Sequence, residues 1–138
     1  MKVLTVRQPW ADAIAHGTKR TENRSWKPPT KHIGAQILIH AAATNDKKAV
    51  LPPEANIGQA FGRIPIARHS AIIAVATLAG CHFDAGCCEP WGMADYYHWE
   101  LADVFALPEP VPAKGQLGFW TPDSDILDAV TAQMAVTS

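Results

Sequence analysis

The chain has 138 residues, of which 48% are hydrophobic and 18% are charged. This composition excludes a disordered chain, and the length predicts one domain spanning residues 1–138. The sequence contains no apolar run long enough to cross a bilayer, and its first residues lack the apolar centre of a signal peptide. We therefore expect a cytoplasmic protein that does not contact a membrane and is a monomer or a weak dimer.

Charged side chains are divided unequally between the two halves. Residues 1–68 hold eleven of the twelve Lys and Arg against four acidic residues, whereas residues 69–138 hold one Lys against nine acidic residues. The overall charge of −1 argues against a nonspecific nucleic-acid binder. The split predicts one basic and one acidic surface, unless strands from the two halves interleave and mix the charges. An adaptor that binds a basic protein through its acidic half is a third possibility, alongside the binding and enzymatic functions considered below.

A strand is expected at Lys2–Val6, followed by a short helix. Pro9 suits the first helical position because it has no N–H to lose. Gly17 is predicted to end the helix in the left-handed conformation. The buried face of the helix has the i, i+3, i+4 spacing: Trp10, Ala13 and Ile14. Residues 18–26 alternate between unlike side chains, which is typical of a polar strand with two different faces.

Three more apolar segments are predicted to be strands: Gln36–Ala43, Ser70–Ala79 and Gly118–Trp120. The second is the longest and is expected at the centre of the sheet. Tyr97–Leu107 has a periodicity that fits a helix or a strand equally well. The prolines that follow it, at positions 108, 110 and 112, predict an extended connector.

The segment 44–68 is predicted to be a helical excursion between strands. Asn45 or Asp46 is a candidate cap for a helix that runs to Val50. A second helix is predicted to begin at Pro53, to bury Ile57 and Phe61, and to end at Gly62. Gly58 and Gly62 make this segment a candidate lid. A C-terminal helix is expected over residues 123–138, capped by Asp123 or Ser124, with an apolar face that comprises Ile126, Leu127, Val130 and Met134.

Several motifs resemble those of the ASCH domain family, which belongs to the PUA-like group. They are Gln8-Pro9-Trp10-Ala11, then Gly17-x-Lys19-x-x-Glu22-x-Arg24, then Ser25-Trp26, with further similarity at residues 37–42 and 115–120. The resemblance runs from about Lys2 to Pro122. It implies an α+β fold, a small PUA-like mixed β-barrel flanked by short helices, and it favours a strand at Tyr97–Leu107. It also implies a module that binds nucleic acid, RNA above all, or a nucleoside or nucleotide.

The central candidates for binding are Lys19, Glu22 and Arg24. In a basic cleft, the two cations would bind a phosphate or a base edge, and the carboxylate would accept from an exocyclic amine or act as a general base. The alternative is an ion-pair network that only holds the strand against the helix. Further candidates surround the motif: Arg7, Trp10, Trp26, Lys27 and His40. Trp26 and Trp91 are the tryptophans expected to be exposed enough to stack on a base, while His40 is either directed into the cleft or a satisfied core histidine.

The resemblance also implies an enzymatic alternative. Some ASCH-like proteins are amidohydrolases that act on 4-acetylcytidine, and others have ribonuclease activity. In that reading Lys19 is the central catalytic residue, Glu22 stands where the amidohydrolases carry a threonine, and Glu100 is the acid from a later strand. No cofactor is expected.

The three cysteines are predicted to be free thiols, since an odd number does not fit a disulfide framework. The pattern Cys81-His82-x-Asp84-x-x-Cys87-Cys88 has poor spacing for zinc, because adjacent cysteines do not easily serve one tetrahedral ion and no CxxC pair exists. We therefore predict no metal site and a loop with two half-buried thiols. Signatures of serine hydrolases, P-loops, dinucleotide-binding folds and zinc proteases are missing.

Overall fold

A computed structural model describes residues 1–55 and 68–136. These residues form six strands, two α-helices and two 3₁₀ turns, in this order: β1 (Lys2–Gln8), α1 (Trp10–Ala15), β2 (Thr21–Arg24), η1 (Thr30–His32), β3 (Gln36–Asn45), η2 (Pro53–Ala55), β4 (Ala71–Phe83), β5 (Tyr97–Pro112), β6 (Phe119–Trp120) and α2 (Ser124–Val136). The α+β class is as predicted, and Tyr97–Leu107 is a strand.

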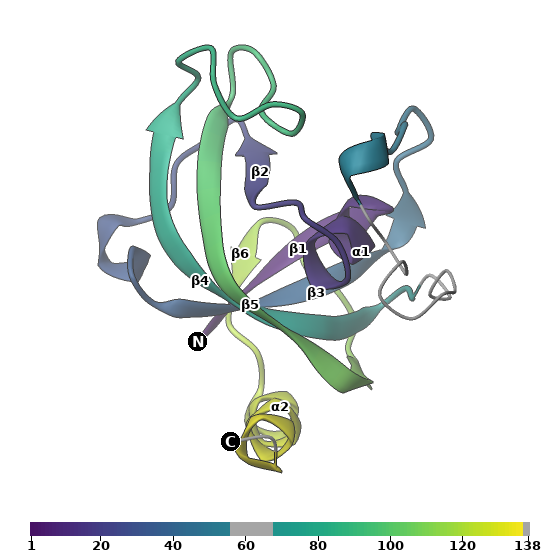
Figure 1. Ribbon diagram of the computed structural model, residues 1–138. Coiled ribbons are helices and arrows are strands. Elements are labelled where there is room, and N and C mark those ends of the chain that lie inside the picture. Colours follow the sequence, from purple (N-terminus) through teal and green to yellow (C-terminus); the bar gives the residue numbers. More distant parts are fainter. Residues whose placement is uncertain (56–67, 137–138) are drawn as a thin grey trace.

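The six strands form one sheet in the order β2-β5-β4-β3-β1-β6, in which β1 and β3 are parallel and the other neighbours are antiparallel. Within the described residues no backbone pairing joins the two ends of this order, so the closed barrel that the resemblance implied is not observed. The sheet is instead strongly curled (Figure 1). The curl brings β2 to β1, where Arg24 Nη2 donates to the Thr5 carbonyl at 2.6 Å.

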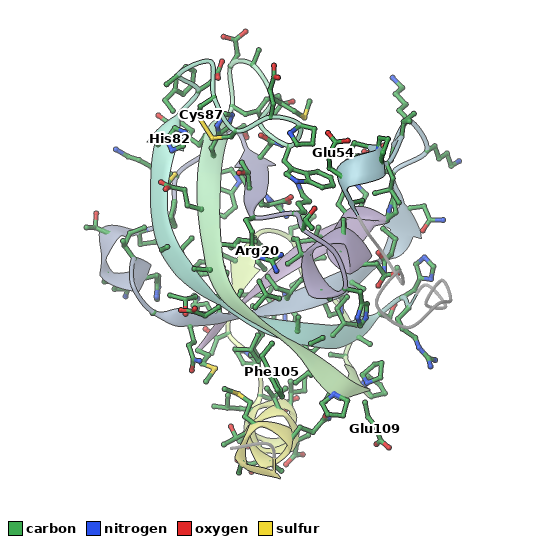
Figure 2. The ribbon with its side chains drawn as sticks, in the orientation of Figure 1. Arg20, Glu54, His82, Cys87, Phe105 and Glu109 are labelled. Carbon is green, nitrogen blue, oxygen red and sulfur yellow. A yellow bond between two sulfur atoms is a disulfide. The ribbon has the colours of Figure 1, made fainter. Side chains whose placement is uncertain are left out.

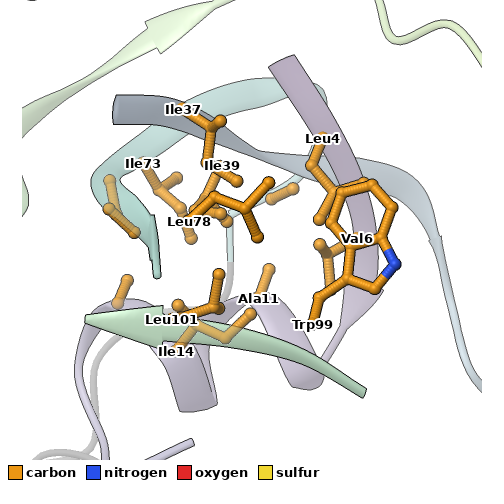
Figure 3. Close-up of a cluster of buried hydrophobic side chains, with 14 of the residues drawn as sticks. Leu4, Val6, Ala11, Ile14, Ile37, Ile39, Ile73, Leu78, Trp99 and Leu101 are labelled. Carbon is orange, nitrogen blue, oxygen red and sulfur yellow. The ribbon is translucent and has the colours of Figure 1, made fainter. Parts of the chain in front are cut away.

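Each face of the sheet buries its own apolar cluster, because alternate residues of a strand point to opposite faces. The concave face packs against α1 and includes Leu4, Ile39 and Trp99 (Figure 3). The other face packs against α2, with Val3, Leu38 and Val130 fully buried. The helix α2 begins after Asp123, whose side chain accepts from the Ile126 N–H at 2.9 Å. The site described below lies on the side of α1.

The strand β5 is longer than predicted and includes the prolines expected in a connector. It pairs with β4 as far as Pro112, which lies opposite Ala71. The short β2 pairs only with Tyr97–Glu100, so among the described residues no strand covers the rest of that edge of β5. Prolines at alternate positions place their missing N–H groups on one side of the strand, and on an uncovered edge they remove no ladder hydrogen bond.

Gly17 has a different role from the one predicted. The φ of Gly17 lies outside the left-handed region, and a Cβ at this position would overlap the Ala55 carbonyl oxygen. The glycine is therefore needed for close approach of two backbone segments and not for the turn itself. The helix α1 is shorter than expected, since Pro9 precedes its first residue and it ends at Ala15.

The excursion after β3 also differs from the prediction. Asp46 accepts from the Lys48 N–H at 3.0 Å, as a helix cap would, but the segment forms only a turn there. A 3₁₀ turn begins at Pro53, where a second helix was expected to begin. The expectations for Ile57 and Phe61 as a buried face, and for Gly58 and Gly62 as hinges of a lid, lie outside the described residues.

Candidate functional site

Lys19 is a buried cation in the link between α1 and β2. The backbone passes close to Ala55 at Gly17, and the Lys19 N–H donates to the Ala13 carbonyl at 3.0 Å. These contacts hold the link against α1. The residue is only 3% exposed. Its ammonium group donates to the Thr21 carbonyl oxygen and lies 3.6 Å from Glu22 Oε1.

Glu22 joins the two cations of the motif. One carboxylate oxygen faces Lys19, and the other accepts from Arg24 Nη2 at 2.9 Å. The carboxylate is buried along with Lys19, whereas Arg24 is partly exposed. We call Lys19, Glu22 and Arg24 the charge network. The structure therefore brings together the three residues that the motif singled out.

Arg24 has unused donor capacity. Its Nη2 donates to both Thr5 and Glu22, but its buried Nε has no hydrogen-bond partner among the described residues. A buried guanidinium N–H without a partner is costly, which makes this atom a candidate contact for a bound acceptor.

Two tryptophans enclose the Lys19 ammonium group. The Trp10 ring centre lies 5.5 Å from Nζ and the Trp91 ring centre 5.3 Å from it, at cation–π distance. Trp10 is fixed by a hydrogen bond from Nε1 to Asp46, which holds the pKa of that carboxyl below its ordinary value. Trp91 is only 9% exposed, so the prediction that it is open to stacking on a base is wrong. It is fixed by Asn23, whose side chain donates to the Trp91 carbonyl at 2.9 Å.

Burial lowers the pKa of Lys19 from its ordinary value, because the charged form is poorly solvated there. The nearby Glu22 carboxylate opposes this effect and Arg24 adds to it, so the net direction is set by desolvation. The arrangement provides a positively charged donor, or a neutral amine above its pKa, next to a carboxylate and a guanidinium.

A second feature is a groove of about 600 Å³ near the start of β1. Its lining is basic and aromatic and includes Lys2, Lys27, Lys31, His32, Trp26 and Phe119. We call it the basic groove. All of its charged residues come from the positively charged half of the sequence, so part of the charge split survives in the fold.

The core holds the aromatic residues of the groove in place. The Trp99 ring packs edge-on against Trp26 at 4.9 Å and against Phe119 at 5.4 Å between ring centres. Trp99 Nε1 also donates to the Trp26 carbonyl at 3.0 Å. Trp99 in turn lies opposite Glu22 in the β2–β5 pairing, so one core residue touches the groove and neighbours the charge network.

Comparison with known proteins matches residues 4–110 to the model of the ASCH domain. The chain belongs to the ASCH domain family. The crystal structure of the ASCH protein from Zymomonas mobilis has a TM-score of 0.58 and 14% sequence identity, over 95% of this chain and 93% of that one. Two mutant forms of the same protein both have a TM-score of 0.57 and 14% identity; each match covers 95% of this chain, and 96% and 94% of the mutant chains. No curated protein matches the sequence.

Three predicted site residues of this ASCH domain belong neither to the charge network nor to the basic groove. Arg7 is exposed on β1. His40 is fully buried, donates from Nε2 to the Ala113 carbonyl at 2.7 Å and packs edge-on against Trp120. Burial lowers the pKa of His40. His40 is therefore a core histidine, but it is not fully satisfied, because its buried Nδ1 has no hydrogen-bond partner among the described residues. Glu100 is half exposed, and its carboxylate pairs with His82 at 3.2 Å.

Several residues at the site were not singled out from the sequence. Asn23 holds the Trp91 loop, and Lys2, His32 and Phe119 line the groove. The Asn23 side chain stands inside the motif, and its amide could have suggested a backbone contact. Lys2 and Phe119 are far apart in the chain, and no local pattern indicates that they meet.

The cysteines are not all free, contrary to the prediction. Cys87 and Cys88 form a disulfide between adjacent residues, and Cys81 is a free thiol. Two histidines approach this pair, so that the candidate ligand atoms of His82, Cys87, Cys88 and His98 all lie within 4.8 Å of one another. His98 was missed because its signal is cross-strand pairing with His82, which the sequence spacing does not reveal.

Among the described residues, no helix has both the length and the apolar character needed to cross a bilayer.

Proposed function

We propose that this ASCH domain binds single-stranded RNA, with its phosphates in the basic groove and its bases on the groove's aromatic rings. The observation that carries this proposal is the combination of lysines with Trp26 and Phe119 in one open groove. Proteins that bind single strands use this combination, because cations follow the phosphates while any base stacks on a ring. The family membership is consistent with it.

The charge network is proposed to recognise one base or nucleotide. The free Nε–H of Arg24 would donate to a carbonyl or phosphate oxygen, and Glu22 would accept from an exocyclic amine. A buried ion-pair network is a poor source of stability, since desolvation offsets most of its attraction. A network that stabilises the fold no more than apolar side chains would in its place, and that leaves a donor unused, is better suited to recognising a ligand.

The groove is tested with the double variant Lys27→Ala plus Lys31→Ala. Each lost phosphate contact reduces the slope of log affinity against log salt by about 0.7 for a single strand, so the pair should reduce it by about 1.4 and weaken binding by about tenfold near physiological salt. Fluorescence anisotropy with short labelled RNAs at several salt concentrations measures both quantities. Lys47→Ala plus Lys48→Ala is the control, because it removes the same charge from the exposed turn after β3. Equal loss in both pairs would contradict the proposed groove.

A second function is favoured by the buried Lys19. We propose as an alternative that Lys19 is the base of an amidohydrolase acting on an acylated nucleoside such as 4-acetylcytidine. Its lowered pKa increases the share of neutral amine, which can take a proton from a water molecule as that water attacks the acyl carbon. The amide bond then breaks as the Lys19 ammonium returns this proton to the departing amine nitrogen, which gives cytidine and acetic acid and restores the neutral amine; the acid then ionises to acetate. Glu100 has no part in this scheme, since its carboxylate is paired with His82.

Lys19→Met tests this alternative, because methionine keeps the apolar stem and removes the amine. Turnover of 4-acetylcytidine, followed by chromatography, is expected to fall by about 10²- to 10⁴-fold. In the unmodified chain the rate should rise with pH through the pKa of Lys19, because the base acts in its neutral form, and this rise should lie below the pH at which a free lysine titrates. Lys48→Met is the control. Turnover that survives in Lys19→Met would exclude this role.

A further inference from the structure

The loop between β4 and β5 gathers four side chains that are common ligands of soft cations. His82 near the end of β4 and His98 near the start of β5 are directly opposite each other in the sheet. Cys87 and Cys88 come from the intervening loop, which folds back over these strand ends (Figure 2). His82 Nε2 lies 3.1 Å from the Cys87 sulfur and 3.6 Å from the Cys88 sulfur, and His98 Nδ1 lies 3.9 Å from the Cys87 sulfur.

These nitrogen–sulfur distances are close to those of a tetrahedral metal site. A zinc ion has Zn–S bonds of about 2.3 Å and Zn–N bonds of about 2.0–2.1 Å, which places nitrogen and sulfur ligands about 3.6 Å apart at the tetrahedral angle. Of the three nitrogen–sulfur distances, one equals this value, one is shorter and one is longer. Two cysteines and two histidines are also a common ligand set of structural zinc sites.

The hydrogen bonds of the histidines provide a second, independent observation. His98 Nε2 lies 2.8 Å from the Met93 carbonyl oxygen, so it carries the proton and leaves the lone pair on Nδ1, the atom that faces Cys87. His82 Nδ1 lies 3.2 Å from a Glu100 oxygen, which in the same way leaves Nε2 free to face the sulfurs. Metal-binding histidines typically donate their other N–H to a carbonyl or carboxylate, which fixes the tautomer and the ring orientation. Both rings have this arrangement.

The backbone explains how adjacent cysteines reach one place. Cys88 has a φ of 73°, in the left-handed region, and its carbonyl accepts from the Gly92 N–H at 2.7 Å. A Cβ at Gly92 would lie 2.8 Å from both the Cys88 Cβ and the His98 ring. The loop is therefore turned tightly around the two sulfurs, and Gly92 leaves the space for them. The sequence-based objection to adjacent cysteine ligands did not include this turn.

We propose that the dithiol form of this loop binds a Zn²⁺-class cation through His82 Nε2, Cys87 Sγ, Cys88 Sγ and His98 Nδ1. Both thiols would lose a proton on binding, so two thiolates and two neutral imidazoles would exactly balance the charge of the ion. The disulfide form lacks the thiolates and would not bind it. A thiol or phosphine reductant would supply the two electrons, and water the two protons, that convert the disulfide into the dithiol. The loop is thus held by the sulfur–sulfur bond when oxidised and by the metal ion when reduced.

A bound ion would also hold Trp91 in place beside the charge network. Trp91 belongs to the same loop, and its N–H donates to the Cys88 carbonyl at 2.9 Å. Since Trp91 covers Lys19, the metal would fix one wall of that site without touching a ligand there.

Cobalt provides the test, because Co²⁺ in a tetrahedral site with thiolate ligands gives strong visible absorption and a sulfur-to-cobalt charge-transfer band. The full chain is reduced with a phosphine under anaerobic conditions, its three thiols are counted, and Co²⁺ is added. We expect one equivalent to bind with tetrahedral spectra, and Zn²⁺ to displace it. Cys88→Ser should remove the charge-transfer intensity of one thiolate and weaken binding by at least a hundredfold, whereas Cys81→Ser, the matched control, should change neither.

Two further results would decide against the site. A weak octahedral spectrum in the fully reduced chain would overturn the proposal, and so would equal cobalt binding in Cys88→Ser and Cys81→Ser. Glu100→Gln tests the support of His82 and should weaken cobalt binding by about 10- to 100-fold, with the tetrahedral spectrum retained. None of these measurements uses RNA or 4-acetylcytidine, so their outcome is independent of the proposed function.

Discussion

Replacing Glu22 with alanine is expected to lower the free energy of unfolding by about 3–5 kcal/mol. The carboxylate is the partner of both cations in the charge network, and Lys19 is only 3% exposed. Without Glu22, the Lys19 ammonium stays buried without its counter-charge, and Arg24 loses its only ionic partner among the described residues. Glu54→Ala is the control, because Glu54 is exposed on η2 and its side chain joins no ion-pair network among residues 1–55 and 68–136.

The loss in Glu22→Ala should depend on pH in a defined direction. Burial already lowers the pKa of Lys19 in the folded chain, so the unfolded chain binds more protons between the folded and the unfolded pKa. Stability contributed by this group therefore rises with pH across that interval. Removing Glu22 lowers the pKa of Lys19 in the folded chain further. In the variant, the rise of the unfolding free energy with pH therefore begins at a lower pH and is larger. Urea unfolding at a series of pH values measures this, and a deficit that stays constant as Lys19 titrates would contradict it.

Replacing Trp99 with alanine is expected to cost about 3–5 kcal/mol of unfolding free energy and also to weaken RNA binding. Trp99 is fully buried and is the largest side chain of the concave cluster (Figure 3). It contacts the rings of Trp26 and Phe119 and donates to the Trp26 carbonyl, so its removal withdraws the support of the aromatic residues in the basic groove. A cavity at Trp99 in the core is therefore expected to disturb Trp26 and Phe119 in the basic groove.

The variant Trp99→Phe separates packing from hydrogen bonding. Phenylalanine fills much of the space but cannot donate to the Trp26 carbonyl, so we expect an intermediate loss of stability. Calorimetry measures the stability, and RNA anisotropy below the unfolding transition measures the groove. RNA affinity that is unchanged in folded Trp99→Ala would show that Trp26 and Phe119 do not depend on this support.

The sequence predicts most elements of this fold because their signals are local. The apolar run around β4, the alternation before Trp26 and the cap at Asp123 each depend on neighbouring residues, and each corresponds to an observed element. The predictions fail where a residue's conformation depends on backbone that is distant in the sequence. Gly17 is required by the approach of Ala55, and the prolines of β5 are tolerated because β2 is too short to cover that edge.

The candidate site likewise has features that the local sequence predicts and features that depend on distant residues. The motif predicted that Lys19, Glu22 and Arg24 would meet, since Glu22 and Arg24 share a four-residue strand and Lys19 lies two residues before its first residue. It did not predict the burial of Lys19 and Glu22. Lys19 is covered by Trp10 and by Trp91, which lies in a loop far along the chain. The cluster of cysteines and histidines was missed because spacing rules assume that ligands come from one loop, whereas His98 enters from the opposite strand.

The hydrogen bond from Arg24 to Thr5 has a kinetic consequence. Neighbouring strands elsewhere in the sheet are joined by ladders of backbone bonds that open together, whereas the described hydrogen bond between β2 and β1 comes from one guanidinium group. Local opening that breaks few bonds costs little free energy. We therefore expect β2 to separate from β1 more readily than hydrogen-bonded neighbouring strands separate from each other. A ligand that takes the place of Thr5 on the guanidinium would capture this opened form. The association rate of that ligand would then be limited by the rate at which β2 separates from β1, and not by diffusion.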